Sequence, residues 1–176
     1  MNLENILKKC KKIKLLILDV DGVLTDGNIF FDNNGHEIKR FNSLDGHGIR
    51  MLIKNNIEVA IITARSSNAV KCRMDNLGIK HLYQNQSNKV VVFKKLISAL
   101  DIKASEVGYI GDDVLDLPVL LKVGLPVAVK NSHDFIKKHC VYITKNKGGH
   151  GAVREIVDII LKAQDKFNIT YNKYLK

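Results

Sequence analysis

Tryptophan is absent from the sequence, and cysteine occurs only three times, as Cys10, Cys72 and Cys140. The odd count and the long spacings argue against a disulfide framework and a zinc-binding signature. Cys72 and Cys140 lie in apolar patterns, so we expect them to be buried thiols. Cys10 lies in a basic run that we expect to be exposed.

Long apolar runs are also missing, since no segment approaches the roughly 20 apolar residues that a membrane span needs. The N-terminus contains Lys and Glu but no apolar stretch before a small-residue cleavage site, which argues against a signal peptide. We therefore expect a cytoplasmic protein without a membrane partner.

Arginine is scarce, because only five of the 28 basic residues are arginines in a chain whose net charge is +10. The lysines are scattered and no aromatic residues are interleaved with them, so we expect no nucleic-acid partner. A basic face that attracts anionic metabolites fits the same charge. Only Arg offers a planar fork for carboxylate or phosphate, so the few arginines are candidates for substrate contacts.

The stretch from Leu15 to Asp26, LLILDVDGVLTD, places two carboxylates directly after an apolar run. The run predicts a buried strand, and residues i and i+2 of a strand point to the same face. Asp19 and Asp21 can therefore share one small site, and Gly22 allows the backbone to turn sharply after them. Two acids this close repel each other unless a cation or a shared proton relieves them. The alternative is a strand that ends in a polar turn.

Strand-like and helix-like segments alternate along the 176 residues, which predicts a doubly wound parallel α/β sheet in a single domain. We expect a core over about residues 13–167, a β-hairpin flap over about 28–41 and a mobile C-terminal tail over about 168–176. The carboxyl ends of parallel strands meet at one edge of the sheet, where ligands bind. The expected strands are 14–20, 58–62, 81–83, 106–110, 126–129 and 141–144, and the main expected helices are 66–77, 89–100, 115–123, 132–139 and 152–167.

Residues suited to phosphoryl transfer follow several of these strands. Thr63 follows the strand 58–62, and Asp112 follows the strand 106–110. Carboxylate oxygens suit Mg²⁺, Lys and Thr bind phosphoryl oxygens, and an Asp can form an aspartyl-phosphate. A single Thr or Lys is more often an ordinary surface or capping residue, but the set in this order indicates a phosphoryl-transfer site. The set is completed by Lys89, Asp113 and Asp116.

The order and spacing of these residues resemble the four motifs of the haloacid dehalogenase-like (HAD) phosphohydrolases, of which DVDGVLTDG matches the first. The resemblance implies that Asp19 is the nucleophile and that Asp21 is the acid/base. It also implies that Thr63 and Lys89 hold the phosphoryl group.

The same resemblance implies a Mg²⁺ cofactor on the carboxylates of Asp19 and Asp112 and the backbone carbonyl of Asp21. Asp113 and Asp116 are then expected to orient the metal site and Lys89 without binding the metal directly. HAD enzymes often carry a cap domain, but only 44 positions separate the first motif from the second and 26 the second from the third. We therefore expect no cap domain, and contacts to substrate from a neighbouring subunit.

Further segments are similar to the KDO 8-phosphate phosphatases, HAD enzymes that release phosphate from 3-deoxy-D-manno-octulosonate 8-phosphate in lipopolysaccharide precursor synthesis. These segments are DGHGIR, ITAR, HLYQNQSNK, GDDVLDLPV and GGHGAVRE. The resemblance implies a sugar-acid phosphate as substrate and a homotetramer. The substrate-binding residues that it implies are Asp21, Asn42, Ser43, Leu44, Asp45, Gly46, Arg50, Arg65, Arg73 and Lys89.

Other functions stay open at this point. GGxGAVRE and DxxGI also occur in phosphatases of nine-carbon sialic-type sugar acid 9-phosphates, and His150 replaces an Arg of the related sequences. A response-regulator receiver uses similar residues, but it pairs adjacent acids near its first strand, whereas here the adjacent pair comes late. A noncatalytic phosphoacceptor or nucleic-acid-binding α/β domain would not need the complete acid set.

The predicted hairpin carries three consecutive apolar residues, Ile29, Phe30 and Phe31. A strand can bury only one of its faces within a monomer, and a lone hairpin is marginally stable in water. We therefore expect the hairpin to lie at the subunit contact of a homotetramer.

Overall fold

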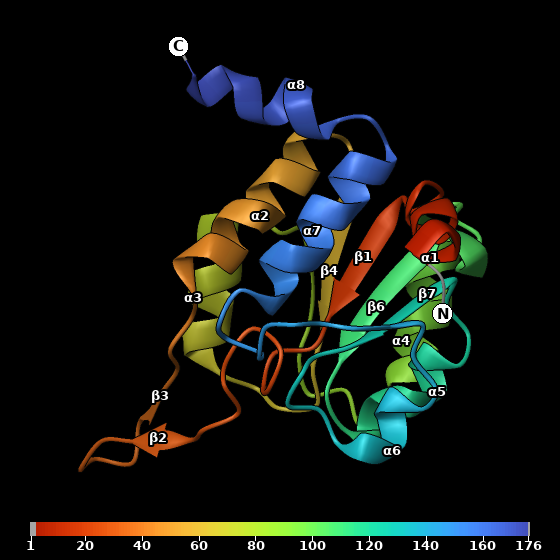
Figure 1. Cartoon of the computed structure of the whole chain (residues 1–176). Helices are drawn as coiled ribbons and strands as arrows, with labels where there is room; N and C mark the ends of the chain where they lie inside the picture. Colours follow the sequence, from red (N-terminus) through yellow and green to blue (C-terminus); the bar gives the residue numbers. More distant parts are fainter. Residues whose placement is uncertain (1–2, 176) are drawn as a thin grey trace.

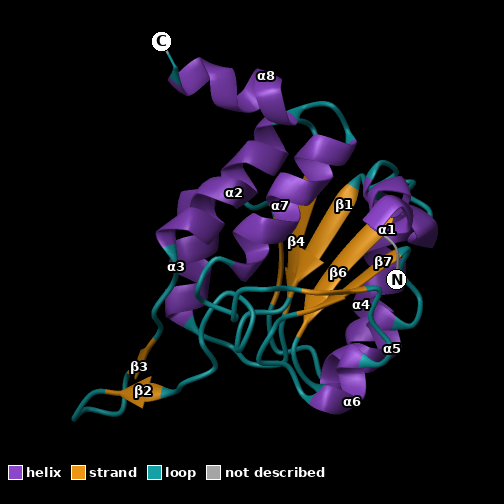
Figure 2. Cartoon of the chain, in the orientation of Figure 1, coloured by secondary structure: helices purple, strands orange, loops and turns teal. Residues whose placement is uncertain are grey.

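The computed structural model describes residues 3–175, and these form a six-stranded parallel sheet with helices on both faces (Figures 1 and 2). The strand order is β5-β4-β1-β6-β7-β8, so the chain winds outward from the central β1 in both directions. This confirms the predicted doubly wound α/β fold. The strands are β1 (Leu15–Leu18), β4 (Glu58–Ile62), β5 (His81–Tyr83), β6 (Val107–Gly111), β7 (Leu125–Ala128) and β8 (Tyr142–Ile143).

Helices cover the sheet in two layers, each with its own apolar cluster. One layer holds α1 (Leu3–Cys10), α2 (Ser43–Lys54), α3 (Asn68–Leu77) and α7 (Ala152–Ala163). The other holds α4 (Lys89–Ala99), α5 (Leu117–Leu120) and α6 (Asp134–Lys137). In the described part of the chain, no helix is long and apolar enough to cross a membrane.

The central strand β1 shows why the sheet is placed between two layers. Leu16 and Leu18 belong to the cluster under α1, α2, α3 and α7, whereas Leu15 and Ile17 belong to the cluster under α4, α5 and α6. Alternate residues of a strand point to opposite faces, so all four are buried and the strand is continuously apolar. β1 pairs in parallel with β4 on one side and with β6 on the other.

The hairpin projects away from this body (Figure 1) and contains two short antiparallel strands, β2 (Phe30–Phe31) and β3 (Glu37–Ile38). Phe30 pairs with Ile38, and Gly35 has the positive φ of +80° that its turn requires. The segment before α2 and the segments between β4 and α4 hold no inserted domain within residues 3–175, as predicted.

Two cysteine predictions were wrong. Cys10 is buried at the end of α1, because it lies on the helix face that packs against the apolar cluster. Cys72 is exposed, because the buried face of α3 is formed by Val70, Met74 and Leu77, and position 72 falls outside it. Cys140 is half-buried.

The C-terminal segment is also more ordered than the predicted mobile tail. After α7 the chain reverses at Asp165, which has a left-handed φ of +57°, and forms helix α8 (Phe167–Tyr171). The ring of Phe167 stacks on that of Tyr171, with centroids 4.0 Å apart, and the Thr170 hydroxyl accepts a hydrogen bond from Asn55. A short 3₁₀ turn follows, while Lys176 lies outside the described residues.

Candidate active site

A cavity of about 200 Å³ opens at the carboxyl ends of β1, β4 and β6. Ligands of doubly wound folds bind at this edge, beside the strand where the winding reverses direction. Eight of the predicted site residues line the cavity: Asp19, Asp21, Thr63, Arg65, Lys89, Asp112, Asp113 and Asp116.

Lys89 and Asp116 form a buried pair at the base of this cavity. Lys89 Nζ lies 2.6 Å from Oδ1 of Asp116 and 3.1 Å from Oδ2 of Asp19, and its side chain is only 2% exposed. Burial opposes the lysine charge, but the carboxylates of Asp19 and Asp116 outweigh it and raise the pKa of Lys89. The amine is therefore a fixed cation next to Asp19.

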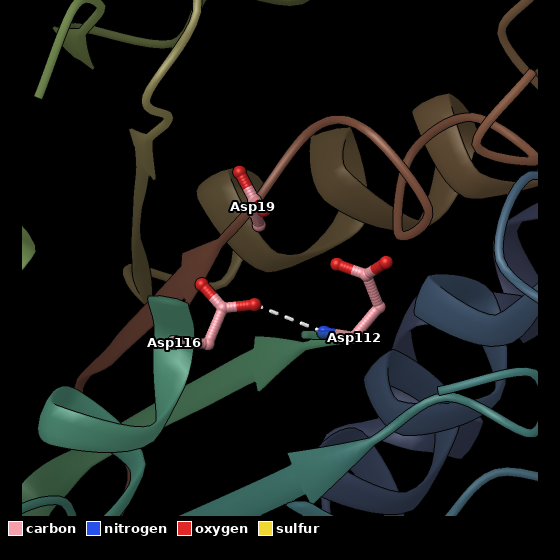
Figure 3. A group of neighbouring side chains, drawn as sticks. All are labelled: Asp19, Asp112 and Asp116. Carbon is pink, nitrogen blue, oxygen red and sulfur yellow. Dashed lines mark hydrogen bonds between the residues drawn. The ribbon is translucent and has the colours of Figure 1, made fainter. Parts of the chain in front are cut away.

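The carboxylate of Asp116 is fully engaged. Oδ1 also accepts a hydrogen bond from the hydroxyl of Tyr109 at 2.6 Å, and Oδ2 accepts from the backbone N–H of Asp112 at 2.9 Å (Figure 3). Asp113 Oδ1 accepts a hydrogen bond from the N–H of Val114 at 2.7 Å, at the start of the turn that follows β6. Asp116 thus fixes Lys89 and the backbone of Asp112, and Asp113 caps the turn Val114–Asp116 that carries Asp116.

Asp19, Asp112 and Asp116 bring carboxylate oxygens within 4.8 Å of one another (Figure 3). Burial, followed by the charges of Asp116 and Asp19, raises the pKa of Asp112 to about 8. Burial and the charge of Asp116 raise the pKa of Asp19 to about 6. The cavity therefore has more negative charge than its protein cations balance.

The donor set fits a small hard cation. Among the described residues, Oδ1 of Asp19 is buried without a hydrogen-bond partner. Gly22 has a φ of +84°, and a Cβ there would lie 2.1 Å from Oδ2 of Asp112, so only glycine lets this carboxylate approach the loop. Carboxylate and carbonyl oxygens are the ligands that Mg²⁺ prefers. Asp116 is unsuitable as a ligand, because its oxygens are already engaged.

Two residues of the hairpin reach this cavity edge and were missed by the sequence analysis. Lys39 Nζ contacts Oδ1 of Asp21, and Glu37 Oε1 lies 3.2 Å from Lys39 Nζ and 2.6 Å from Nη2 of Arg65. Lys39 directly follows β3, and alternation along an extended chain places positions 37 and 39 on one side, but only the folded hairpin brings that side to Asp21.

The other predicted substrate-binding residues lie outside the cavity, along α2 and α3. Arg50 donates to the backbone carbonyl of Asn76 at 2.5 Å, and Arg73 lies over the ring of Phe41. Burial, and then the charge of Arg50, lowers the pKa of Arg73. A Cβ on Gly46 would lie 2.2 Å from Arg73 Nη2, so the glycine makes room for this guanidinium.

Two polar side chains at the start of α2 accept hydrogen bonds from backbone N–H groups of the protein. Asn42 Oδ1 accepts from the N–H groups of Leu44 and Asp45, at 2.8 and 3.3 Å, and Ser43 is the first helical residue. Asp45 is 1% exposed and accepts from the N–H groups of Gly151, the residue before α7, and of Arg154 in its first turn. Neither Asn42 nor Asp45 lines the cavity.

His150 also lies away from the acids. Its Nδ1 is 2.8 Å from the carbonyl oxygen of Gly148, and it lines a separate cavity beside Leu44 and Arg154. His47 pairs with the hydroxyl of Tyr174, at 2.9 Å from Nε2. Among the described residues, no histidine lines the cavity that contains the acids.

Comparison with known proteins assigns the family. A model of the haloacid dehalogenase-like hydrolases matches residues 81–156. The 3-deoxy-D-manno-octulosonate 8-phosphate phosphatase of Salmonella typhi is 51% identical, over 93% of this chain and 87% of its own length. The chain belongs to the KDO 8-phosphate phosphatase family. As a member of this HAD family it is a phosphoric monoester hydrolase, as predicted.

Solved structures of KDO 8-phosphate phosphatases have the same fold. The Yersinia pestis enzyme has a TM-score of 0.92 and 48% identity, over 93% of this chain and 89% of its own. The enzyme of Moraxella catarrhalis, crystallised with magnesium, phosphate and KDO, has a TM-score of 0.96 and 40% identity over 98% of this chain and 99% of its own.

Proposed function

We propose that this phosphatase hydrolyses 3-deoxy-D-manno-octulosonate 8-phosphate to KDO and phosphate with Mg²⁺, as a cytoplasmic step of lipopolysaccharide precursor synthesis. The observation that carries the proposal is a buried aspartate, Asp19, with one oxygen held by a lysine and the other unengaged, in a cavity rich in carboxylates. Identity of about half the residues to phosphatases named for this substrate supports the choice of ester.

In the proposed reaction, a carboxylate oxygen of Asp19 attacks phosphorus, and Lys89 Nζ, 3.1 Å from Oδ2, fixes the side chain. A phosphorus–oxygen bond forms to Asp19 and the ester bond breaks, and Asp21 gives its proton to the departing alcohol oxygen. Asp21 then removes a proton from a water that attacks the aspartyl-phosphate, which releases phosphate and regenerates the carboxylate of Asp19. Thr63 and Lys89 bind the phosphoryl oxygens.

The carboxylates of Asp19 and Asp112 and the backbone carbonyl of Asp21 would hold Mg²⁺. The ion supplies positive charge for the phosphoryl oxygens and relieves the repulsion between the acids. Asp116 orients Lys89 and the Asp112 backbone, and Asp113 caps the turn that carries Asp116.

Arg65 lines the cavity and is proposed to bind an anionic group of the substrate. We assign the sugar-acid end of the substrate to the α2–α3 side, with Arg50, Arg73 and the segment 42–46. Because these groups lie outside the cavity in one protomer, we further propose a homotetramer in which a neighbouring subunit completes the enclosure. The exposed apolar hairpin supports this assembly.

Phosphate release from a panel of esters tests the function. We expect KDO 8-phosphate to give the highest kcat/KM, above nine-carbon sugar acid 9-phosphates and ribose 5-phosphate, and turnover to require Mg²⁺. Preference for a nine-carbon ester would replace the proposed substrate with the alternative one.

The Asp19→Asn variant tests the mechanism separately. An amide is a poor nucleophile and a weaker metal ligand, so we expect no measurable turnover from a protein with a normal circular dichroism spectrum. Near-wild-type phosphate release from purified Asp19→Asn would exclude the aspartyl-phosphate route.

A further inference from the structure

The two aspartates of the proposed mechanism are held in the same way. Asp19 has Oδ2 beside Lys89 Nζ at 3.1 Å, and Asp21 has Oδ1 in contact with Lys39 Nζ. Their other oxygens, Asp19 Oδ1 and Asp21 Oδ2, are buried and accept no hydrogen bond from the residues described. Each carboxylate therefore has one oxygen fixed by a lysine and one oxygen left for chemistry.

Lys39 is buried to an extent unusual for a lysine. Its side chain is 3% exposed, close to the 2% of Lys89, although it comes from the hairpin that otherwise projects into solvent. A buried ammonium is costly unless it is paired. Here Asp21 and Glu37 pair with it from two sides, and Glu37 also holds Arg65.

The four side chains form a closed ring of alternating charge. Arg65 Nε completes the ring at 3.7 Å from Oδ2 of Asp21, beyond hydrogen-bond distance. Burial opposes the charge of Glu37, but hydrogen bonds from Lys39 and Arg65 lower its pKa, so it remains an anion at neutral pH. Because Glu37 keeps Lys39 paired, the lysine stays in place without depending on Asp21 alone.

We propose that Lys39 is a positioning residue for the acid/base, which fixes Oδ1 of Asp21 so that Oδ2 is the oxygen that handles the proton. The inference rests on the proposed acid/base role of Asp21. A general acid must lie within hydrogen-bond reach of the atom that it protonates, so a carboxylate free to rotate would be in the productive orientation less often. The hairpin thereby takes part in the reaction of its own protomer.

The dependence of the rate on the leaving group separates positioning from two simpler roles. Loss of a p-nitrophenolate needs little protonation, whereas loss of an alkoxide needs a proton from the acid. We compare kcat/KM, which covers the steps through loss of the leaving group, for three esters. These are KDO 8-phosphate, ribose 5-phosphate and p-nitrophenyl phosphate.

For Lys39→Met we expect kcat/KM to fall on the order of tenfold more for both alkyl esters than for the aryl ester, which is a part of the roughly 10²–10⁴-fold that an acid–base group contributes. Lys39→Arg, which keeps a cation, should recover part of this loss. Arg40→Met is the matched control, because Arg40 is the next residue and pairs with Asp26, and it should behave as wild type. Equal losses on all three esters would show that Lys39 only docks the hairpin. A loss confined to KDO 8-phosphate would show that it binds the substrate carboxylate, and either result would overturn the proposal.

Asp21→Asn separates this inference from the proposed function. If Asp21 is the acid, Asp21→Asn alone should lose more activity on alkyl than on aryl esters, and adding Lys39→Met should lower kcat/KM by less than about twofold further. No leaving-group dependence in Asp21→Asn would contradict the acid role itself. A normal Asp21→Asn result together with full additivity would contradict only the positioning role of Lys39. Thermal unfolding of each variant confirms that the compared proteins are folded.

Discussion

At the residue scale, the acids of the cavity set how the protein responds to pH and metal. The pKa values of Asp112 and Asp19 in the folded chain, about 8 and about 6, exceed the ordinary aspartate value of 3.8. From the ordinary aspartate value up to these raised values, the metal-free folded protein keeps protons that the unfolded chain releases. Its free energy of unfolding therefore falls as the pH rises through this window. Metal binding requires the ionised acids and therefore competes with these protons.

We expect Mg²⁺ to bind more tightly near pH 8 than near pH 6, because these are the pKa values of Asp112 and Asp19 and both acids must ionise. Mg²⁺ should therefore release protons as it binds. The rise in Tm on adding Mg²⁺ to chelator-treated protein should grow over the same interval. Isothermal titration calorimetry in buffers of different ionisation enthalpy measures the number of protons released when Mg²⁺ binds. Asp112→Asn should lose most of the affinity, and an affinity that does not change with pH would contradict the assignment of these acids.

Arg65 and Arg73 provide a second residue-scale prediction. Lysine keeps the charge but loses the planar fork, so Arg65→Lys and Arg73→Lys should each weaken transition-state binding of KDO 8-phosphate by about 1.5–3 kcal/mol. The aryl ester, which lacks the sugar acid, should be affected less. Steady-state kcat/KM on both esters gives the comparison, with Arg40→Lys as control. Equal losses on both esters would mean that these arginines do not recognise the sugar acid.

The residues that line the cavity were predictable where a strand end fixes their place. Asp19, Thr63 and Asp112 each follow a buried strand, and parallel strands bring such positions to one edge. Lys39 was not predictable, because its position depends on how the hairpin folds back over Asp21. No periodicity of the sequence encodes that contact.

At the element scale, one buried carboxylate joins α2 to α7. Asp45 lies in the first turn of α2, and its oxygens accept from the N–H groups of Arg154 and Gly151 at 2.8 and 3.2 Å. Gly151 has no side chain to cap α7, so a residue more than a hundred positions away supplies the cap. Burial raises the pKa of Asp45, although the α7 N–H groups lower it. Both helix N-termini therefore share one anion.

This junction extends to the acidic loop, which we define as residues 19–26. Asn42 donates to the carbonyl of Gly149, whose N–H donates in turn to the carbonyl of Val23 at 2.9 Å. A Cβ on Gly148 would lie 1.7 Å from the carbonyl oxygen of Gly22. The glycine pair thus packs backbone against backbone on Gly22, Thr25 and Asp26 of the acidic loop.

We expect Gly148→Ala to displace the acidic loop, because its clash is with backbone that cannot rotate away. Overpacking of this kind costs about 1–3 kcal/mol of stability, and kcat should fall along with Tm. Gly48→Ala is the control, since a Cβ there would lie 3.0 Å from the flexible Arg154 side chain. Wild-type kcat in Gly148→Ala would show that this packing does not position the loop.

Two helix boundaries could not be predicted from the local sequence. The predicted helix 115–123 is a 3₁₀ turn, Val114–Asp116, followed by the short α5, because Asp116 turns its carboxylate back to the N–H groups of Asp112 and Asp113. The predicted helix 152–167 ends at residue 163, before Asp165 adopts its left-handed φ. Both departures come from contacts or backbone angles that apolar periodicity does not report.

At the scale of the whole molecule, no domain within residues 3–175 caps the cavity, and the apolar side chains of the hairpin are exposed. Ile29, Phe30, Phe31 and Ile38 are 50%, 45%, 62% and 54% exposed, although they are large and apolar. Phe30 and Ile38 face each other across the two strands, so their apolar surface is continuous. Contiguous exposed apolar surface of this kind marks an interaction site, and two short strands leave unpaired edges.

We expect these hairpins to meet in the proposed homotetramer, where closed symmetry would bury the apolar residues and pair the strand edges. A Phe30→Asp, Phe31→Asp double variant should therefore dissociate, since charges in a closed apolar contact are costly. Dissociation would also remove the neighbouring subunit from the uncapped cavity, so KM for KDO 8-phosphate should rise. Light scattering at micromolar concentration gives the assembly state. Ile169→Asp, on the exposed face of α8 at 65% exposure, is the matched control and should stay assembled. A monomeric wild-type enzyme with full activity would refute the idea, as would a double variant that keeps both its mass and its KM.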